Sequence, residues 1–218
     1  MFRSLALAAA LSLVACDDAT EGKPVATVQE AAPAAPTPPP AAAEPAAAAP
    51  AAMAIPEGAT PLAGDSTIEW IGAKVTKSHP GGFKVLDGWA QVDGEQISRA
   101  QVVIDLDSTF SDSEKLTKHL KDPDFFDVGT FPKATFDITA ITAGGADGAS
   151  HTVTGTLDFH GVKKEIGFPA TVTMAEGAAT IAAEFVLNRQ DFGISYPGRK
   201  DDLIKDEVLV KGQLRFKG

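Results

Sequence analysis

Cysteine is nearly absent from this sequence, and positive charge is scarce relative to negative charge. The 218 residues include one cysteine, Cys16, close to the N-terminus. The body of the chain therefore has no disulfide, no thiolate metal site and no catalytic thiol. Lysine and arginine number 19 against 29 acidic residues, which gives a net charge of −10. This balance argues against nucleic-acid binding by phosphate neutralisation and against a basic membrane-docking face.

Long hydrophobic runs are also scarce, and the clearest one, residues 5–14, follows a single basic residue, Arg3. The run is too short to span a bilayer and is typical of an export signal. The tetrad Leu-Val-Ala-Cys that ends at Cys16 resembles the bacterial lipobox, in which the cysteine thiol receives a diacylglyceryl group. We therefore predict a signal peptide over residues 1–15 and a lipoprotein anchored through Cys16 on the periplasmic side of a bacterial membrane. Asp17, which follows, slightly favours the inner membrane.

Alanine and proline make up the next stretch, where residues 31–52 contain only two residues of other types. Proline removes backbone donors and fixes φ, which keeps this stretch out of a sheet and favours extended polyproline conformation, at about 3.1 Å per residue. We predict that residues 16–61 form a disordered linker that buries no core and lets the domain stand well off its membrane. The folded domain is expected over residues 62–218, a length that suits one core.

Alternation of apolar and polar residues with a period of two dominates this domain. In the clearest case Val153, Gly155, Leu157 and Phe159 share one face, while threonines and an aspartate occupy the other. Such alternation predicts half-buried strands. Similar segments lie near residues 67–77, 83–92, 100–107, 134–142, 165–173, 180–188 and 207–217. About eight strands with short connections favour an all-β, antiparallel barrel that holds side chains or one small ligand, and a sandwich of two sheets is the alternative.

One segment, SDSEKLTKHLK (residues 111–121), departs from this pattern. Its opening Ser-Asp-Ser-Glu is typical of a helix start, and Leu116 and Leu120 lie four residues apart. We predict one short helix, which ends at Asp122 because the residue before a proline is pushed out of the helical region.

The polar residues match no familiar catalytic or metal-binding motif. The acidic residues after the expected helix lack the glycine that a calcium loop needs at its sixth position. The four histidines lack zinc-ligand spacing, and the chain has no nucleophile elbow or phosphate-binding glycine loop. The sequence therefore favours a protein that is not an enzyme and holds no cofactor or metal. A hydrolase or isomerase that uses His119 or His160 with a nearby aspartate is the less favoured alternative.

The stretch KHLKDPDFFDVGTFPKATF, residues 118–136, closely resembles the signature of the YceI-like family. The resemblance continues, with its spacing intact, through VTGTLDFHGVKKEIGFPATV (153–172), LNRQDFGI (187–194) and KDEVLVKGQLRF (205–216). It is weaker in the first strands, where Asp65 and Ser66 stand in place of the family's common His-Ser pair. We therefore do not assign to this chain the ligand contacts that other family members make in these first strands.

This resemblance implies a lipocalin-like barrel in the periplasm, with an elongated apolar cavity that holds a polyisoprenoid such as a quinone tail or a polyprenyl phosphate. Sheltering one isoprene unit of about five carbons gains roughly 3–4 kcal/mol before ordering costs are subtracted. The expected partners are this lipid and, through the anchor, the membrane. A membrane redox protein of the cytochrome b561 type, served by an accessory that handles quinone, is an alternative partner. A homodimer also stays open.

The candidate ligand-binding residues are large apolar side chains on the expected strands and beside the expected mouth: Trp70, Trp89, Phe126, Phe136, Phe159, Phe185 and Phe192. A phenylalanine on a strand fits an ordinary core equally well, and this alternative stays open. Asn188, Arg189 and Asp191 resemble a polar corner of the family, and an arginine close to an aspartate is typical of an ion pair that fixes a loop. Residues 196–205 are the least strand-like stretch after the helix and are the candidate for a mobile flap.

Overall fold

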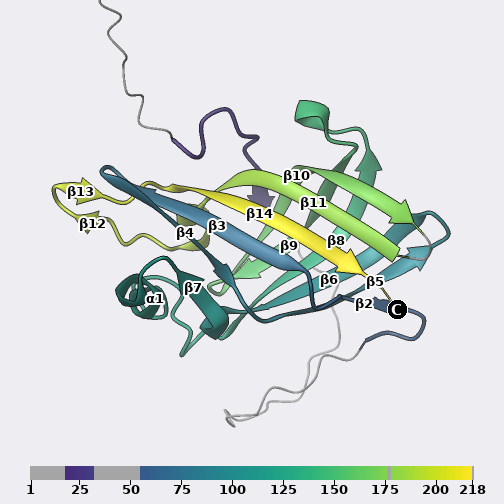
Figure 1. Ribbon diagram of the computed structural model, residues 1–218, viewed down its shortest axis with the longest axis horizontal. Coiled ribbons are helices and arrows are strands. Elements are labelled where there is room, and N and C mark those ends of the chain that lie inside the picture. The colour runs from purple at the N-terminus through teal and green to yellow at the C-terminus, as the bar shows by residue number, and fades with distance from the viewer. Residues whose placement is uncertain (1–17, 32–54, 176–177, 218) are drawn as a thin grey trace, which may run out of the picture.

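The computed structural model describes residues 18–31, 55–175 and 178–217. They form a 12-stranded antiparallel sheet that curls around an apolar interior (Figure 1). Its strands are β1 (Thr27–Glu30), β2 (Thr60–Pro61), β3 (Thr67–Lys74), β4 (Lys77–Phe83), β5 (Leu86–Asp93), β6 (Gln96–Asp105), β7 (Thr109–Ser111), β8 (Lys133–Ala143), β9 (His151–Phe159), β10 (Val162–Ala175), β11 (Ala178–Asn188) and β14 (Glu207–Phe216). The order in space is β2-β5-β6-β8-β9-β10-β11-β14-β3-β4-β7, and β1 pairs with β10.

The predicted class, an all-β antiparallel barrel with one short helix, is confirmed, but the predicted number of strands was too low. β4 explains part of the difference, because its sequence KSHPGGF has a proline, two glycines and no clean alternation. Gly81 is required on this strand, since the indole ring of Trp70 on β3 lies against it and a Cβ atom there would overlap that ring. The very short β2 and β7 gave no pattern that could be detected in the sequence.

The helix α1 (Glu114–Leu120) forms where it was predicted. Its N-cap is Ser113, whose side chain accepts a hydrogen bond from the Leu116 amide at 3.5 Å. Ser111, which opens the predicted start signal, lies outside the helix and instead accepts from the Ser113 amide at 3.2 Å. The helix, β7 and a small hairpin of β12 (Gly198–Arg199) and β13 (Asp202–Leu203) gather at one end of the barrel, on the left in Figure 1. We call this the near end.

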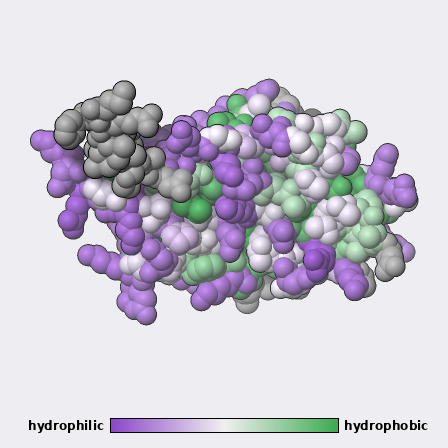
Figure 2. Space-filling model, turned by 45° about the horizontal axis from the view of Figure 1, so that its top comes forward, coloured by the Kyte–Doolittle hydropathy of each residue, from purple (hydrophilic) through white to green (hydrophobic). Residues whose placement is uncertain are grey.

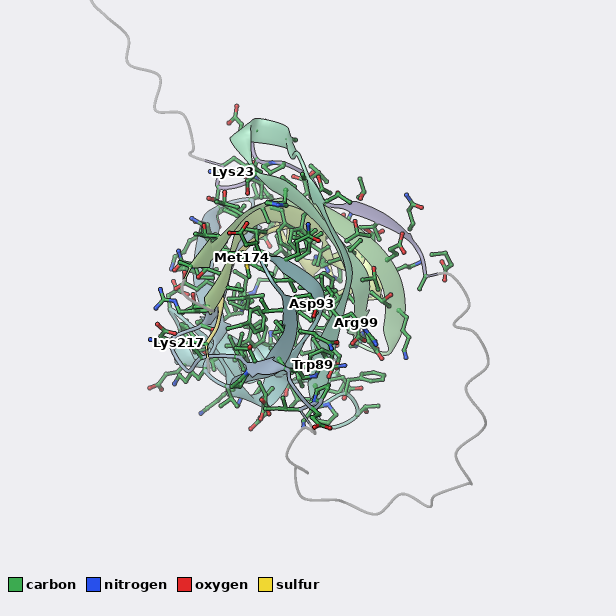
Figure 3. The ribbon with its side chains drawn as sticks, turned by 90° about the vertical axis from the view of Figure 1, so that its right-hand side faces the viewer. Lys23, Trp89, Asp93, Arg99, Met174 and Lys217 are labelled. Atoms are coloured by element: carbon green, nitrogen blue, oxygen red, sulfur yellow. The ribbon has the colours of Figure 1, made fainter. Side chains whose placement is uncertain are left out.

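The opposite, far end is closed by the chain just before β3. The Leu62 amide donates to the Gly88 carbonyl of β5 at 2.9 Å, and the Ala63 amide donates to the Arg215 carbonyl of β14 at 2.7 Å. Residues 61–63 thereby join two strands that are far apart in the sheet order. Figure 3, which looks at the far end, shows the strands curling around an interior filled with side chains.

β10 and β11 form a ladder along only part of their length. Their paired residues run from Ala175 and Ala178 at the hairpin to Ala170 and Ala183. Toward the near end, the N-terminal segment lies between them. β1 pairs with residues 164–167 of β10, while on β11 the Val186 amide donates to the Pro24 carbonyl and its carbonyl accepts from the Ala26 amide. Residues 24–30 therefore complete the barrel wall.

The prediction of a disordered linker over residues 16–61 was thus wrong for residues 18–31. Ala26 is buried in the main core and Val28 packs against it. Two inward-facing residues make a short pattern. Because the long alanine and proline run follows directly, the sequence did not indicate a strand here. The expected domain boundary at residue 62 was also too late, because β2 already pairs with β5.

Ion pairs fix the same N-terminal segment to the barrel. Nζ–O distances are 2.6 Å for Lys205 and Asp18, 3.1 Å for Lys23 and Glu184, and 2.6 Å for Lys164 and Glu30. The expected signal peptide, Cys16, Asp17 and residues 32–54 of the expected linker lie outside the described residues. In the part of the chain that the structure describes, no helix is long and apolar enough to cross a membrane.

Candidate ligand-binding site

An apolar cavity of about 230 Å³ lies inside the barrel and extends toward α1. Strands from all around the barrel contribute to its lining, as do the segments at the near end. Apart from Arg189 and Lys205, every lining residue is aliphatic, aromatic or glycine. On the scale at which a dry cavity of about 150 Å³ holds benzene, this space accommodates roughly two isoprene units.

The alternation on β9 explains how one strand supplies several lining groups. Val153 and Leu157 are buried and line the cavity together with Phe159, as their shared face predicted. Gly155 lies between them on the same face, where the Phe136 ring from the neighbouring β8 crosses the strand. A Cβ atom at Gly155 would lie 2.7 Å from Phe136 Cε2. Glycine at this position therefore leaves room for an aromatic ring from the next strand.

Two groups of aromatic rings shape the cavity wall. In the barrel interior, the ring centroid of Phe168 lies 5.7 Å from that of Phe136 and 4.1 Å from that of Phe185, with which it is stacked. Toward the near end, the Phe126 ring lies 5.9 Å from Phe83 and 5.7 Å from Phe159. The tilted contacts in both groups are of the kind that aromatic pairs prefer.

Five of the seven candidate residues line this cavity: Trp70, Phe126, Phe136, Phe159 and Phe185. That they contact a ligand stays a prediction. Trp89 and Phe192 do not belong to the lining. Trp89 precedes Ala90, which is fully buried in the core cluster, and so faces the other side of β5; Figure 3 shows it at the lower margin of the barrel. Phe192 is fully buried behind Phe159, with their ring centroids 5.7 Å apart.

The structure adds lining residues that the sequence interpretation did not name. Phe168 lies on a strand that was predicted correctly, so its inward position followed from the alternation of residues 165–173. Phe83, Leu120, Phe125 and Ile194 come instead from the end of a strand, from a helix and from loops. Their convergence at the near end depends on tertiary packing, and no local pattern indicated it.

Arg189 is a buried cation in the cavity wall. Its Nη1 donates to the Ile194 carbonyl at 2.6 Å, its Nε donates to the Lys205 carbonyl at 3.1 Å, and its Nη2 lies 2.8 Å from Asp206 Oδ1. The expected role of this arginine in fixing a loop fits these contacts, but its carboxylate partner is Asp206 and not Asp191. The guanidinium holds the chain on both sides of the β12–β13 hairpin.

The segment 196–205, the candidate flap, contains that hairpin and is attached to β3. The Val75 amide donates to the Leu203 carbonyl at 3.0 Å, and the Lys205 amide donates to the Ala73 carbonyl at 2.8 Å. Lys74 also forms an ion pair with Asp202, and this contact lowers the pKa of the Asp202 carboxyl. Backbone hydrogen bonds thus hold the hairpin to β3 in the state described, and its mobility stays a prediction.

The histidines of the enzyme alternative do not line the cavity. His119 lies on α1, where its ring packs against Phe125 and Tyr196 and its Nε2 lies 3.4 Å from Asp124 Oδ2. His160 lies in the turn after β9, with its Nδ1 3.0 Å from the Phe192 carbonyl. The convergence inside the cavity that this alternative requires is not found. Across residues 18–31, 55–175 and 178–217, no group of three or more acidic, histidine or cysteine side chains is placed to hold a metal.

Comparison with known proteins agrees with this architecture. The family model of the YceI-like domain matches residues 63–216. A UPF0312 protein of Pseudomonas putida strain GB-1 is 34% identical over 141 residues, which cover 61% of this chain and 72% of the relative. Among solved structures, BcnA of Burkholderia cenocepacia is 26% identical with a TM-score of 0.61 and covers 69% of this chain and 95% of its own.

A second solved structure, a polyisoprenoid binding domain from Saccharophagus degradans implicated in plant cell wall breakdown, has a TM-score of 0.60 at 19% identity. The match covers 74% of this chain and 98% of that domain. At this identity the likeness shows the fold. The N-terminal segment 18–31, which completes the barrel wall, lies outside the residues that the family model matches.

Proposed function

Because this chain belongs to the YceI-like family, we propose that it binds a polyisoprenoid or a related amphiphilic lipid inside the barrel. The observation that carries the proposal is the lining, in which aliphatic and aromatic groups surround the cavity and the two charged residues are engaged with carboxylates. Burial of apolar surface is the main driving force that such a site offers. The description of the Saccharophagus degradans domain as polyisoprenoid binding supports the same class of ligand.

The cavity sets a length for the part of the ligand that it encloses. A volume of about 230 Å³ shelters a short stretch of chain, and a longer isoprenoid would continue between the half-buried rings of Phe83, Phe126 and Phe159 toward the near end. These rings belong to a loop and to strand ends, where side chains move at lower cost than in a closed ladder. We therefore place the entrance for the lipid at the near end.

Solvent extraction of the purified protein, followed by mass spectrometry, tests this proposal. We expect a co-purifying isoprenoid, or uptake of one from detergent by the extracted protein. A protein that carries no isoprenoid and takes up neither a prenylated quinone nor a polyprenyl phosphate would contradict the proposed function.

The proposal includes attachment to the periplasmic side of a bacterial membrane through an acylated Cys16. One support is the lipobox-like tetrad that ends at Cys16. A second is the position of Asp18, two residues after Cys16, because Asp18 pairs with Lys205 of the cavity lining. Because residues 18–31 are docked on the barrel, an anchor two residues before Asp18 would hold the domain close to the membrane surface. Hydrophobic residues on the face seen in Figure 2 are interspersed with hydrophilic ones, so this face offers no broad apolar contact for a bilayer.

Replacement of the acylation site tests the anchor. Cys16→Ser is expected to release the protein from washed membranes, because the lipid supplies the attachment. Immunoblots of membrane and soluble fractions would show the release, and retention of the variant in the membrane fraction would contradict the anchor.

The largely apolar lining, whose two cations are paired with carboxylates, also favours a second candidate function, an accessory that handles quinone for a membrane redox protein of the cytochrome b561 type. In that case membranes that contain the redox protein would reduce quinone bound to this protein faster than they reduce quinone bound to an unrelated carrier. Equal rates would remove this candidate and leave lipid binding intact.

A further inference from the structure

Two turns project together from the near end of the barrel. They are the end of the β3–β4 hairpin, residues 74–77, and the β12–β13 hairpin, residues 198–203, which lie side by side on the left of Figure 1. We call these residues the tip. The Val75 amide of one turn donates to the Leu203 carbonyl of the other at 3.0 Å. The two turns therefore form one unit.

The tip exposes two large apolar side chains, since Val75 is 67% exposed and Leu203 is 49% exposed. Lys74 and Ile204 form an antiparallel bridge, so Val75 and Leu203 come next in the same register and share a face. A two-residue hairpin turn favours glycine, asparagine or aspartate, so turn chemistry does not explain Val75. Exposed apolar residues that are scattered singly need no explanation, but an adjoining pair indicates a contact outside the chain.

Positive charge surrounds this apolar pair. The tip contains four cations and two carboxylates, which are Lys74, Lys77, Arg199 and Lys200 against Asp201 and Asp202. The Asp202 carboxylate is engaged within the tip, because it pairs with Lys74 and accepts a hydrogen bond from Thr76 Oγ1 at 2.9 Å. Arg199 and Lys200 are exposed. The charge balance of the whole chain, −10, therefore does not hold at the tip, where cations are in excess.

A narrow apolar tip with basic residues around it fits an anionic lipid surface. The apolar side chains enter the head-group region, whereas lysine and arginine keep their charged groups at the level of the phosphates. The N-terminal segment points to the same side of the molecule, because Asp18 pairs with Lys205, which lies two residues after the tip. A chain anchored just before Asp18 would hold the tip close to the bilayer.

We propose that the tip inserts Val75 and Leu203 into the head-group region of a bilayer that contains anionic phospholipid, and so turns the near end of the barrel toward the membrane. A contact of two apolar side chains is weak and reversible, so it orients the domain and does not replace the anchor. The inference goes beyond the proposed function, since it assigns a surface of the protein to the membrane whatever the cavity holds.

The test reads the position of single residues at a vesicle surface. Each protein is full-length and carries Cys16→Ser, so an acyl anchor cannot contribute and an introduced cysteine is the only thiol. Val75→Cys and Leu203→Cys place a polarity-sensitive fluorophore on the tip. Val85→Cys, at a valine that is 53% exposed in the β4–β5 connection, is the matched control. Residues 1–15 are the same in all three proteins and so cannot cause a difference between the probes.

Vesicles of equal parts of phosphatidylcholine and phosphatidylglycerol, with and without nitroxide-labelled lipid, are compared with vesicles of phosphatidylcholine alone. On the anionic vesicles we expect the emission of both tip probes to shift to shorter wavelength and to be quenched by the nitroxide lipid. The probe at residue 85 should show neither change. If one hairpin does not tolerate its label, the probe on the other hairpin still decides the result.

The contribution of charge is tested with Lys77→Gln combined with Lys200→Gln in the labelled Val75→Cys protein. One basic residue near an anionic surface is worth about five-fold in affinity, so we expect the vesicle Kd to rise about 25-fold. Arg99→Gln combined with Lys217→Gln removes the same charge from the far end, where Figure 3 labels both residues. This control is expected to raise the Kd less than about two-fold, because salt screens distant charges.

Three results would overturn the proposal: tip probes that do not respond to anionic vesicles, an equal response of the probe at residue 85, or equal insertion into phosphatidylcholine alone. Equal effects of the two pairs of charge substitutions would also contradict it. None of these results bears on the proposed function, which solvent extraction and the release of Cys16→Ser from washed membranes test separately.

Discussion

The far and near halves of the barrel are built in different ways. In the far half, β10 and β11 pair directly, from Ala175 and Ala178 to Ala170 and Ala183, and residues 61–63 close the end. In the near half, β10 and β11 separate and the N-terminal segment 24–30 fills the wall between them. A helix, a hairpin and loops complete that half.

The buried side chains form two apolar clusters. The main core combines small residues with large ones, among them Ala90, Ala100, Phe136, Phe168 and Phe185, whereas Trp70, Leu120, Phe125 and Ile194 form a separate cluster at the near end. A wall made of pieces from distant parts of the chain has more places where one piece can move without breaking a whole ladder. We therefore expect the far half to be the more rigid one, which agrees with the entrance proposed at the near end.

The largest expected effect is the loss of ligand uptake when a charge enters the lining. Phe159 lines the cavity and contacts the Phe126 and Phe192 rings, so Phe159→Asp places a carboxylate among apolar groups. We expect uptake of isoprenoid to be abolished while the fold survives, because this residue is half-buried and the near end can admit water. Circular dichroism and solvent extraction on the same preparation measure both properties.

Thr154→Asp, on the opposite face of β9, is the matched control and should bind as the wild type does. A folded Phe159→Asp variant with wild-type uptake would reject the assignment of Phe159 to the binding site. An unfolded variant would instead show that Phe159 belongs to the structural core.

The next largest effect concerns the close contact between β8 and β9. Gly155→Ala introduces a Cβ atom that overlaps with the Asp137 carbonyl and the Phe136 ring, so we expect the free energy of unfolding to fall by about 3 kcal/mol, the upper range for overpacking. Gly212→Ala is the matched control, since a Cβ atom there meets nothing within 4 Å. Its expected change is below about 1 kcal/mol. Urea unfolding measures both, and equal losses would contradict the packing at Gly155.

The sequence predicted most of the regular half of this molecule. Period-two alternation located β6, β8, β9, β10, β11 and β14, because each of these strands buries one face over many residues. It failed for residues 24–30, which include β1 and in which Ala26 and Val28 pack into the core, and for β4, where glycines replace the side chains that would show a pattern. β1 takes its place through pairing with distant residues of β10, which local composition does not encode, whereas β4 forms a hairpin with β3, which directly precedes it.

The candidate site residues were likewise predicted best on the regular strands. Phe136, Phe159 and Phe185 line the cavity, whereas Trp89, which was chosen in the same way from the expected strand at residues 83–92, does not. Its face depends on register, and a shift by one residue turns a side chain to the other side of the sheet. The lining residues of the near end come from loops and a helix, and only the fold brings them together.

Removal of the N-terminal wall segment should have a smaller effect on stability. Deletion of residues 18–31 exposes the apolar surface that Ala26 and Val28 cover and leaves the β10 and β11 amides of the gap without partners. We expect the free energy of unfolding to fall by about 2 kcal/mol. We also expect a bound isoprenoid to dissociate faster, because the wall of the near half is opened.

Urea unfolding and a ligand-release assay on the deletion variant measure these two effects. Gln29→Ala, at an exposed position of β1, serves as the control and should change neither. If the deletion variant is as stable as the wild type, residues 18–31 do not contribute to the fold and serve only as a linker, as the sequence predicted.

The smallest expected effect is that of the ion pair next to the expected anchor. A hydrogen bond from Lys205, with others from Thr20, lowers the pKa of the Asp18 carboxyl below its usual value. A group whose pKa is lower in the folded than in the unfolded state adds stability above the unfolded pKa, and this stability is lost as the pH falls through the folded pKa. Asp18→Asn should therefore lower the free energy of unfolding by less than about 1 kcal/mol at pH 7, since the pair is partly exposed. The difference from wild type should begin to shrink as the pH falls below about 4, the usual pKa of an aspartate, and vanish only below the lowered pKa of the folded state. Urea midpoints of both proteins between about pH 2.5 and 7 measure the difference, with Asp147→Asn in the β8–β9 connection as a control for an exposed aspartate. A difference that persists unchanged at the lowest pH would show that Asp18 holds the segment through its shape and not through its charge.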